Sequence, residues 1–301
     1  MGIGKYLREI GRGKDGARPL SREQAADLFG QVLDRSVSDL EIGGFCLAMR
    51  IKGETPAEMA GFLDATRERL QPVAAGTRPV VVIPSYNGAR KLPGLTSLLA
   101  LLLARAGMPV LVHGTGTEST RVHTAGVLAA LGVAARTSTD AVAPGETAFM
   151  PTALLCPGLQ SLLAVRTLVH LRNPAHSLVK MLNPCIGRAL VVSSYTHPEY
   201  LQSMAQTFAL IGSDALLLRG TEGEAVANPR RMPRMDAFVG GRQALLERAE
   251  PGSLATVPDL PSAIDPASTA AYIEQVLCGA LAVPAPIQRQ VEHILMLASR
   301  L

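Results

Sequence analysis

Two consecutive strand-loop-helix units within residues 78–132 constrain the fold more than any other part of the chain. In the first unit, the apolar run 80–83 is followed by a polar loop and by a long apolar segment at 95–106. The second unit repeats this order after the apolar run 110–112. Such units build a parallel sheet covered by helices, and ligands of these sheets lie at the loops that follow the strands. Both loops are therefore candidate site loops.

Length and composition predict a globular protein. With 301 residues and 48% hydrophobic content, the chain can bury one large core or two unequal ones. Its longest uncharged apolar run, 95–104, is too short to span a bilayer, and residues 1–20 contain no apolar signal-peptide core. We expect a cytoplasmic protein without membrane contact. The four cysteines show no CxxC spacing, so neither a zinc site nor a disulfide framework is indicated.

The distribution of charge is more informative than the net charge of +4. Residues 1–22 carry six Lys or Arg in a glycine-interrupted segment that we do not expect in the core, and residues 228–242 carry four Arg against Asp236. Such clusters form solvated basic faces or, less often, surfaces for phosphates and polyanions. The chain has no Trp and no aromatic residues interleaved with the basic ones, which argues against base stacking.

Capping signals predict a helical opening before the first strand. Ser21 predicts a helix that runs to about residue 33, Asp39 is expected to cap a second helix, and Thr55 followed by Pro56 begins a third. A linker at 71–77 follows. The later elements that we expect are helices at 159–171, 177–182, 198–211, 268–282 and 286–301 and strands at 190–193 and 214–219.

Three stretches resemble one known family. The opening 20–61, the central segment with His113, Gly114 and Ser119, and the later segment with Arg172 resemble, in this order, the anthranilate phosphoribosyltransferases and their relatives among family-three glycosyltransferases. The resemblance covers nearly the whole chain. It implies the α/β nucleoside phosphorylase/phosphoribosyltransferase class II fold, in which a small all-helical domain joins a larger domain with a mainly parallel sheet flanked by helices. The implied domains are 1–72 with 159–184 returning to it, and 78–158 with 185–301.

The departures from the family concern its donor site. Catalytic members have a glycine-rich loop that cradles the pyrophosphate of the donor, whereas this chain has Pro84, Ser85, Tyr86, Asn87, Gly88 and Ala89. Proline lacks an N–H and the larger side chains occupy space, so we expect the cradle to be lost. The family's magnesium-binding acidic pair aligns with Ala225 and Val226, while Glu222 and Glu224 lie out of register. We therefore expect no metal, no cofactor and no catalytic residue.

The remaining polar residues form an expected vestigial phosphate pocket, which consists of Asn87, Gly88, Thr96, His113, Gly114, Ser119 and Arg172. We expect His113 to be a hydrogen-bonded turn residue and not a catalytic base, because the sequence places no Ser or Cys partner beside it. Ser193, Ser194 and His197 are expected to cap a loop, since no nucleophile elbow surrounds them.

The segments 83–91, 193–200 and 219–224 resemble the YbiB branch of this family. The resemblance implies a homodimer that binds nucleic acid, with DNA as the expected partner, and clustered charge favours phosphate contacts over base readout. Arg90 and Lys91 are expected at the start of a helix, where anions are favoured. The candidate contacts are the N-terminal group Lys5, Arg8, Arg12, Lys14 and Arg18, followed by Arg90, Lys91, Arg230, Arg231 and Arg234.

Two alternatives remain open. A phosphoribosyl or other pentosyl transferase with an unknown acceptor would need magnesium and phosphoribosyl pyrophosphate. A small-molecule phosphate sensor would keep Arg172 and Ser119 without any chemistry.

Overall fold

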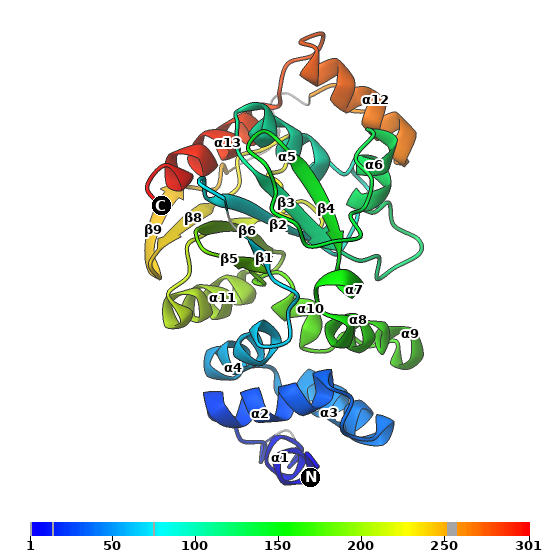
Figure 1. The fold of residues 1–301 in the computed structure, drawn as a ribbon, viewed down its shortest axis with the longest axis vertical. Helices are drawn as coiled ribbons and strands as arrows, with labels where there is room; N and C mark the ends of the chain where they lie inside the picture. Colours follow the sequence, from blue (N-terminus) through cyan, green and yellow to red (C-terminus); the bar gives the residue numbers. More distant parts are fainter. Residues whose placement is uncertain (1, 14, 75, 252–257) are drawn as a thin grey trace.

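A computed structural model describes residues 2–13, 15–74, 76–251 and 258–301. Figure 1 shows a layer of helices that contains the N-terminus and, above it, a sheet flanked by helices. The helices are α1 (Gly4–Ile10), α2 (Arg22–Leu33), α3 (Asp39–Lys52), α4 (Pro56–Arg67), α5 (Thr96–Arg105), α6 (Thr124–Ala130), α7 (Thr152–Leu155), α8 (Pro157–Ala164), α9 (Arg166–Val169), α10 (Ala175–Leu178), α11 (Pro198–Ile211), α12 (Pro266–Leu277) and α13 (Ala285–Ala298). The strands are β1 (Val73–Ala74), β2 (Val80–Ser85), β3 (Val110–Gly114), β4 (Thr147–Pro151), β5 (Cys185–Ile186), β6 (Ala189–Tyr195), β7 (Ala215–Arg219), β8 (Met235–Val239) and β9 (Arg242–Glu247).

Side-chain caps fix the starts of α2, α3 and α4. Ser21, Ser38 and Thr55 each accept a bond from a backbone N–H in the first turn, and the side chain of that residue bonds back to the cap. The predicted caps of α2 and α4 are confirmed. The prediction for α3 is wrong by one residue, because Ser38 caps the helix and Asp39 is its first residue.

Helix α1 was not expected. The basic N-terminal segment folds as a short helix whose apolar side chains Ile3, Tyr6 and Ile10 are buried, and it packs on α3. These positions are three and four residues apart, which places them on one helical face. Basic residues separate these positions in the sequence, so the composition of the segment did not indicate an apolar face.

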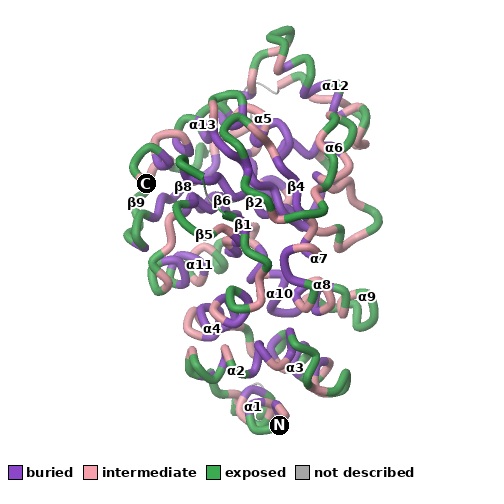
Figure 2. Tube along the Cα trace, viewed as in Figure 1, coloured by how far each residue is buried: buried purple, intermediate pink, exposed green. Residues whose placement is uncertain are grey.

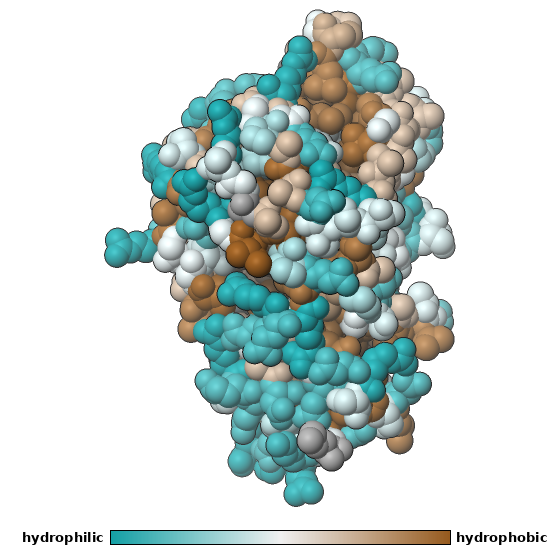
Figure 3. All heavy atoms as spheres, viewed as in Figure 1, coloured by the Kyte–Doolittle hydropathy of each residue, from teal (hydrophilic) through white to brown (hydrophobic). Residues whose placement is uncertain are grey.

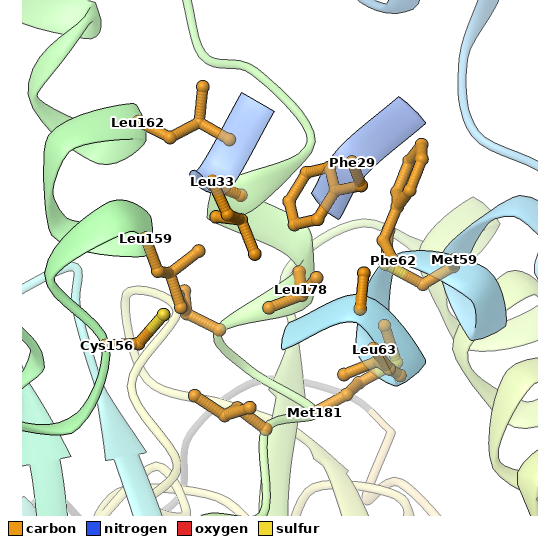
Figure 4. Close-up of a cluster of buried hydrophobic side chains, with 14 of the residues drawn as sticks. Phe29, Leu33, Met59, Phe62, Leu63, Cys156, Leu159, Leu162, Leu178 and Met181 are labelled. Atoms are coloured by element: carbon orange, nitrogen blue, oxygen red, sulfur yellow. The ribbon is translucent and has the colours of Figure 1, made fainter. Parts of the chain in front are cut away.

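The segment between β4 and β5 packs on the N-terminal helices. Helix α8 lies against α2, and α10 lies against α4. Figure 4 shows the shared core, in which Phe29 and Phe62 meet Leu159 and Leu178. The rings of Phe29 and Phe62 are stacked with centroids 4.6 Å apart. Two segments distant in the sequence thus complete one apolar core, while the exact domain boundaries remain predictions.

The larger sheet has the strand order β4-β3-β2-β6-β7-β8-β9 within the described ranges. The strands from β4 to β7 in this order run parallel, whereas β8 and β9 form an antiparallel hairpin at the edge. The predicted α/β class is confirmed, but β4 and the hairpin were not expected as strands. The hairpin follows a proline-rich stretch, and β9 is largely exposed, so it lacks the apolar run that marks the other strands.

Strands β2, β3 and β6 are buried along their whole length, and Figure 2 shows buried residues concentrated in the sheet. Alternate side chains of β2 enter two apolar cores, one on each face of the sheet. Because the central strands are parallel, their carboxyl ends and the loops that follow lie at one edge. Among the described residues, no helix is long and apolar enough to cross a membrane.

Candidate functional site

The loop after β2 keeps the N–H groups of an anion cradle, which corrects our expectation that the cradle is lost. The backbone N–H groups of Tyr86, Asn87 and Gly88 lie 3.1, 2.7 and 2.9 Å from one atom, Oε1 of Glu224. Successive N–H groups that converge in this way form an anion-binding nest. Pro84 removes none of these donors, because it precedes all three.

Hydroxyl groups surround the second carboxylate oxygen. Ser85 Oγ donates to Oε2 of Glu224, and the hydroxyls of Thr96 and Thr124 lie 3.4 and 3.5 Å from the same atom. Glu224 itself is only 3% exposed. Burying a carboxylate is costly unless hydrogen bonds replace the lost water. Here the N–H and hydroxyl donors of the cradle make this replacement.

Glu224 reaches the cradle from a tight turn after β7. Thr221 and Glu224 form an isolated antiparallel bridge, and Glu222 and Gly223 between them have φ values of +54° and +88°. Two successive positive φ values are typical of a type I′ turn, which favours Asn and Gly. Glutamate at the first of these positions is strained.

The carboxylate of Glu222 holds the turn against the β2 loop. It accepts bonds from the backbone N–H groups of Arg90 and Lys91 at 2.5 and 2.9 Å. The prediction that Arg90 and Lys91 begin a helix is wrong, because α5 starts at Thr96 and both residues lie in the preceding bend. Their backbone is fixed by Glu222, and their side chains are exposed.

Tyr86 and His113 form a buried hydrogen-bonded pair below the cradle. The Tyr86 hydroxyl lies 2.9 Å from His113 Nδ1, and it accepts a bond from Thr152 Oγ1 at 2.9 Å. His113 Nε2 lies 3.2 Å from the Leu182 carbonyl, and burial lowers the pKa of His113 to about 4. The predicted turn position is wrong because His113 lies inside β3, but its hydrogen bonds are satisfied. Next to it, a side chain at Gly114 would collide with the Ser85 carbonyl.

Three arginines surround a second carboxylate, that of Glu118, beside the cradle. Glu118 Oε atoms lie 2.9, 2.7 and 3.3 Å from nitrogens of Arg121, Arg166 and Arg172. Burial alone would raise the pKa of Glu118, but the bonds from Arg166 and Arg121 lower it to about 2. Arg172 also lies 3.4 Å from Asn87 Oδ1. Ser119 follows Glu118 in the same loop and is exposed.

A cleft of about 440 Å³ lies between the helical layer and the sheet, next to the cradle. Arg172, His176 and Lys180 line it together with Ser194. Burial lowers the pKa of Lys180 to about 8, although the charge of Glu224 opposes this shift. Burial also lowers the pKa of His176 to about 4, and its Nε2 has no hydrogen-bond partner among the described residues.

The hydroxyls of Ser193 and Ser194 stabilise loops. Ser193 donates to the carbonyl of residue 180, and Ser194 donates to the carbonyl of residue 223.

The residues at this edge do not fit a magnesium ion. Ala225 and Val226 are buried within an apolar core. The oxygens of Glu224 face N–H and hydroxyl donors, whose positive ends would repel a cation. In the part of the chain that the structure describes, no group of three His, Cys, Asp or Glu could hold a metal.

The N-terminal basic candidates are partly neutralised. Lys5 lies 3.8 Å from Asp27, and Arg12 forms an ion pair of 2.8 Å with Glu9. Arg8 and Arg18 are exposed, and Lys14 lies outside the described residues. Figure 1 places α1 at the end of the helical layer that is remote from the sheet. These candidates and the cradle are therefore separate in one subunit.

The later arginine cluster follows the Glu224 turn. Arg230 Nε lies 3.3 Å from Asn228 Oδ1, and Arg234 makes two bonds of 2.7 and 2.8 Å to the buried Asp236. Arg231 is half-buried. Because Asp236 compensates Arg234, this residue contributes less positive charge to the surface than the sequence suggests.

The structure thus brings together Asn87, Gly88, Thr96, His113, Gly114 and Arg172 around the cradle, whereas Ser119 is exposed in the loop that carries Glu118. Sequence reasoning missed Glu224 as the occupant of the cradle, and it also missed Glu118 and Lys180. A usable signal existed, because Glu222 and Glu224 follow the end of β7, a parallel strand of the same sheet. We did not predict a role for them because they do not align with the family's acidic pair.

Comparisons with known proteins agree with this architecture. Residues 5–70 match the helical bundle domain of a glycosyl transferase family. The chain is 42% identical over 301 residues to the uncharacterized protein YbiB of Escherichia coli (strain K12), covering 96% of this chain and 92% of YbiB. It is 29% identical over 269 residues to the anthranilate phosphoribosyltransferase of Methylorubrum extorquens (strain PA1), covering 87% of this chain and 79% of that enzyme.

The fold is also shared with a solved structure. Anthranilate phosphoribosyltransferase from Thermus thermophilus matches with a TM-score of 0.70 at 24% identity, covering 95% of this chain and 85% of that one. At this identity the match supports the fold alone, whereas the identity to YbiB extends over almost the whole chain. The chain belongs to the anthranilate phosphoribosyltransferase-like glycosyltransferase family, in the branch that includes YbiB.

Proposed function

We propose that the protein is a cytoplasmic homodimer that binds nucleic acid, DNA above all, through its phosphates and without sequence preference. One observation carries the proposal. The turn with Glu222 and Glu224 fixes the loop that bears Arg90 and Lys91 to the loop that leads into residues 228–234. Two basic segments that are distant in the sequence are thereby joined at the carboxyl edge of the sheet.

The charges at this edge are available to a partner. The side chains of Arg90, Lys91 and Arg219 are exposed, and none of the three has an ion pair within the described ranges. Exposed cations on ordered backbone can contact phosphates without first breaking an internal ion pair. Arg230 and Arg231 extend the same edge as further candidates, with the exposed N-terminal residues Arg8 and Arg18 as a second group.

The filled cradle argues against phosphoribosyl transfer. Its N–H groups, which would otherwise bind the donor's pyrophosphate, already bind Glu224. Catalysis of this kind depends on positioning and on stabilising developing charge. A donor would therefore need to displace a buried carboxylate before it could be positioned.

An apolar face supports the homodimer. On α3, Leu40, Leu47 and Ile51 are 86%, 51% and 62% exposed, and Leu168 on α9 is 81% exposed. Figure 3 shows hydrophobic side chains at the right edge of the helical layer, over α9 and α3, next to an otherwise hydrophilic surface. Exposed apolar side chains gathered on one flank are typical of an interaction surface. We propose that a second copy of the chain covers this flank.

Fluorescence anisotropy with labelled oligonucleotides tests the proposal. Duplexes of unrelated sequence should bind with similar affinity at one salt concentration, and so should unrelated single strands among themselves, because phosphate contacts carry no sequence information. Absence of binding at low salt, or a strong preference for one sequence among shuffled ones, would reject it.

A transferase that uses a phosphoribosyl donor is the second candidate. The observation that favours it is the open cleft of about 440 Å³ lined by Arg172 and Lys180, together with the similarity to phosphoribosyltransferases. Consumption of phosphoribosyl pyrophosphate in the presence of magnesium and candidate acceptors would support this candidate.

A further inference from the structure

The cleft of about 440 Å³ extends from the neighbourhood of the cradle to the start of α11. Figure 1 shows α11 between α4 and the sheet, and α11 contacts both. One wall of the cleft comes from the end of α3 and the loop before α4, and the other comes from residues 172–181 and the first turns of α11. Its volume lies within the range of about 300 to 1,000 Å³ that is usual for small-ligand sites. The lining residues differ from those whose N–H and hydroxyl groups form the cradle.

Two exposed aromatic rings stand at the start of α11. His197 precedes the helix and Tyr200 lies in its first turn, and their ring centroids are 6.4 Å apart at an interplanar angle of 50°. Pro198 at the first helical position fixes the backbone between them. Neither ring makes a hydrogen bond within the described ranges, and Tyr200 is 37% exposed although it lines the cleft. An aromatic face that is held in place and left uncovered offers a surface on which a planar ring can stack.

Two polar side chains in the same cleft lack protein partners. His176 is 9% exposed, and its Nδ1 accepts a bond of 3.3 Å from the backbone N–H of Asn173, so the unpartnered Nε2 can donate. Lys180 has neither a hydrogen bond nor an ion pair among the described residues, and its pKa of about 8 leaves it charged at neutral pH. Buried polar atoms without a partner are costly. An anion in the cleft is the ligand that suits both groups.

The charges that line the cleft are positive on balance. Arg50, Arg172 and Lys180 stand against Glu54 and Glu199. Arg50 is exposed and has no ion pair in the part of the chain that the structure describes. Burial raises the pKa of Glu54, because it disfavours the charged carboxylate. A stacking surface beside a region that favours anions matches a nucleotide, which joins a planar base to a phosphate.

We propose that the cleft binds one unpaired nucleotide of a single strand, with the base stacked on Tyr200 and the phosphate beside Lys180 and His176. The inference rests on the proposed nucleic-acid binding, and it adds a site that distinguishes single strands from duplexes, whose bases are already paired and stacked. Every base has a flat face, so stacking adds no strong sequence preference. The sequence did not indicate this site, because the aromatic rings lie on α11 while the basic residues come from α3 and from the segment 172–180.

Fluorescence anisotropy with a labelled oligothymidine strand, the same strand without bases, and a duplex of equal length tests the stacking. The variant Y200A removes the ring, Y200F keeps it, and L210A removes an exposed side chain elsewhere on α11 as a matched control. We expect Y200A to bind oligothymidine roughly fivefold to a hundredfold more weakly than the wild type, as is usual when one stacked base is lost. Its affinity for the abasic strand and for the duplex should not change, and Y200F and L210A should behave as the wild type.

The outcomes separate this inference from the proposed function. If Y200A binds all three ligands as the wild type does, or loses as much affinity for the abasic strand as for oligothymidine, the stacking on Tyr200 is wrong although nucleic-acid binding stands. If the wild type binds none of the three at low salt, the proposed function fails and this inference fails with it. Thymidine monophosphate is a further ligand in the series, and binding as tight as that of the strand would assign the cleft to a free nucleotide and overturn the proposal.

Amine modification of Lys180 in the wild type tests the position of the phosphate without any variant. A phosphate beside the ammonium favours the charged form, so a saturating concentration of oligothymidine should raise the pH midpoint of the modification. A saturating duplex should leave that midpoint near pH 8. An unchanged midpoint with oligothymidine bound would overturn the placement of the phosphate beside Lys180.

Discussion

Replacement of Arg90 and Lys91 by alanine should reduce the salt dependence of nucleic-acid binding. Both side chains are exposed and have no ion pair within the described ranges, so each can neutralise one phosphate. Their backbone N–H groups bind Glu222 and do not depend on the side chains. The double variant should therefore retain the loop and the fold.

The magnitude follows from counterion release. Each phosphate contact contributes about 0.9 to the slope of log affinity against log salt on duplex DNA. Two lost contacts should lower that slope by about 1.8. Across a fourfold rise in salt, each phosphate contact adds a factor of about 3.5 to the fall in affinity. The fall in affinity over that interval should therefore be about 12-fold smaller for the double variant than for the wild type.

Anisotropy titrations from about 50 to about 200 mM salt measure this difference. The double variant R242A/R300A removes the same charge from exposed positions at the opposite end of the sheet, where neither side chain has an ion pair within the described ranges, and its slope should stay within the error of the wild type. R234A should change the slope by less than one full contact, because Asp236 already compensates Arg234. An unchanged slope in R90A/K91A, with a reduced slope in R8A/R18A, would refute the sheet-edge site and move the contacts to the N-terminal group.

Three further predictions concern catalysis, ionisation and assembly. Turnover of anthranilate with phosphoribosyl pyrophosphate and magnesium should be slower than in an active enzyme by roughly a thousandfold or more, because the cradle is filled and Ala225 and Val226 replace the metal-binding pair; ordinary turnover in a coupled assay would disprove this. The modification of Lys180 by an amine-specific reagent, measured by mass spectrometry, should rise with pH around a midpoint near pH 8, because burial disfavours the charged form of this amine. A midpoint above about pH 10 would contradict its buried position. L47E should shift the protein from dimer to monomer in sedimentation analysis, because it places a charge on the exposed face of α3, whereas the same change at Leu245 on β9 should leave the dimer intact.

Local signals in the sequence predicted much of the fold. The caps Ser21 and Thr55 and the apolar runs at 80–83 and 110–112 depend on neighbours in the sequence, so they could be recognised without coordinates. Helix α1 was missed because three buried apolar residues alternate with basic ones. Strand β9 was missed because an exposed edge strand needs no apolar run, and the buried strand β8 was missed because it follows a proline-rich stretch and Asp236 interrupts its apolar residues.

The candidate site was less predictable, because its central contact joins residues far apart in the sequence. The loss of the glycine-rich loop was visible in the sequence, but the occupant of the cradle was not. Glu224 meets residues 86–88 only because β2 and β7 are parallel strands of one sheet that end at the same edge. The wrong prediction that His113 lies in a turn has a different cause. Gly114 suggested a turn, but this position is in β3, where the close approach to β2 leaves no room for a side chain.

A single titration series with DNA, RNA and phosphoribosyl pyrophosphate under matched salt and magnesium tests the central claim most directly. The claim is that the edge of the sheet binds nucleic acid while the cradle is closed to the donor by Glu224. We predict that both nucleic acids bind with an affinity that falls as salt rises, and that phosphoribosyl pyrophosphate neither binds at the same protein concentration nor competes with DNA. Tight binding of phosphoribosyl pyrophosphate by the wild type, with no binding of either nucleic acid at low salt, would contradict the account.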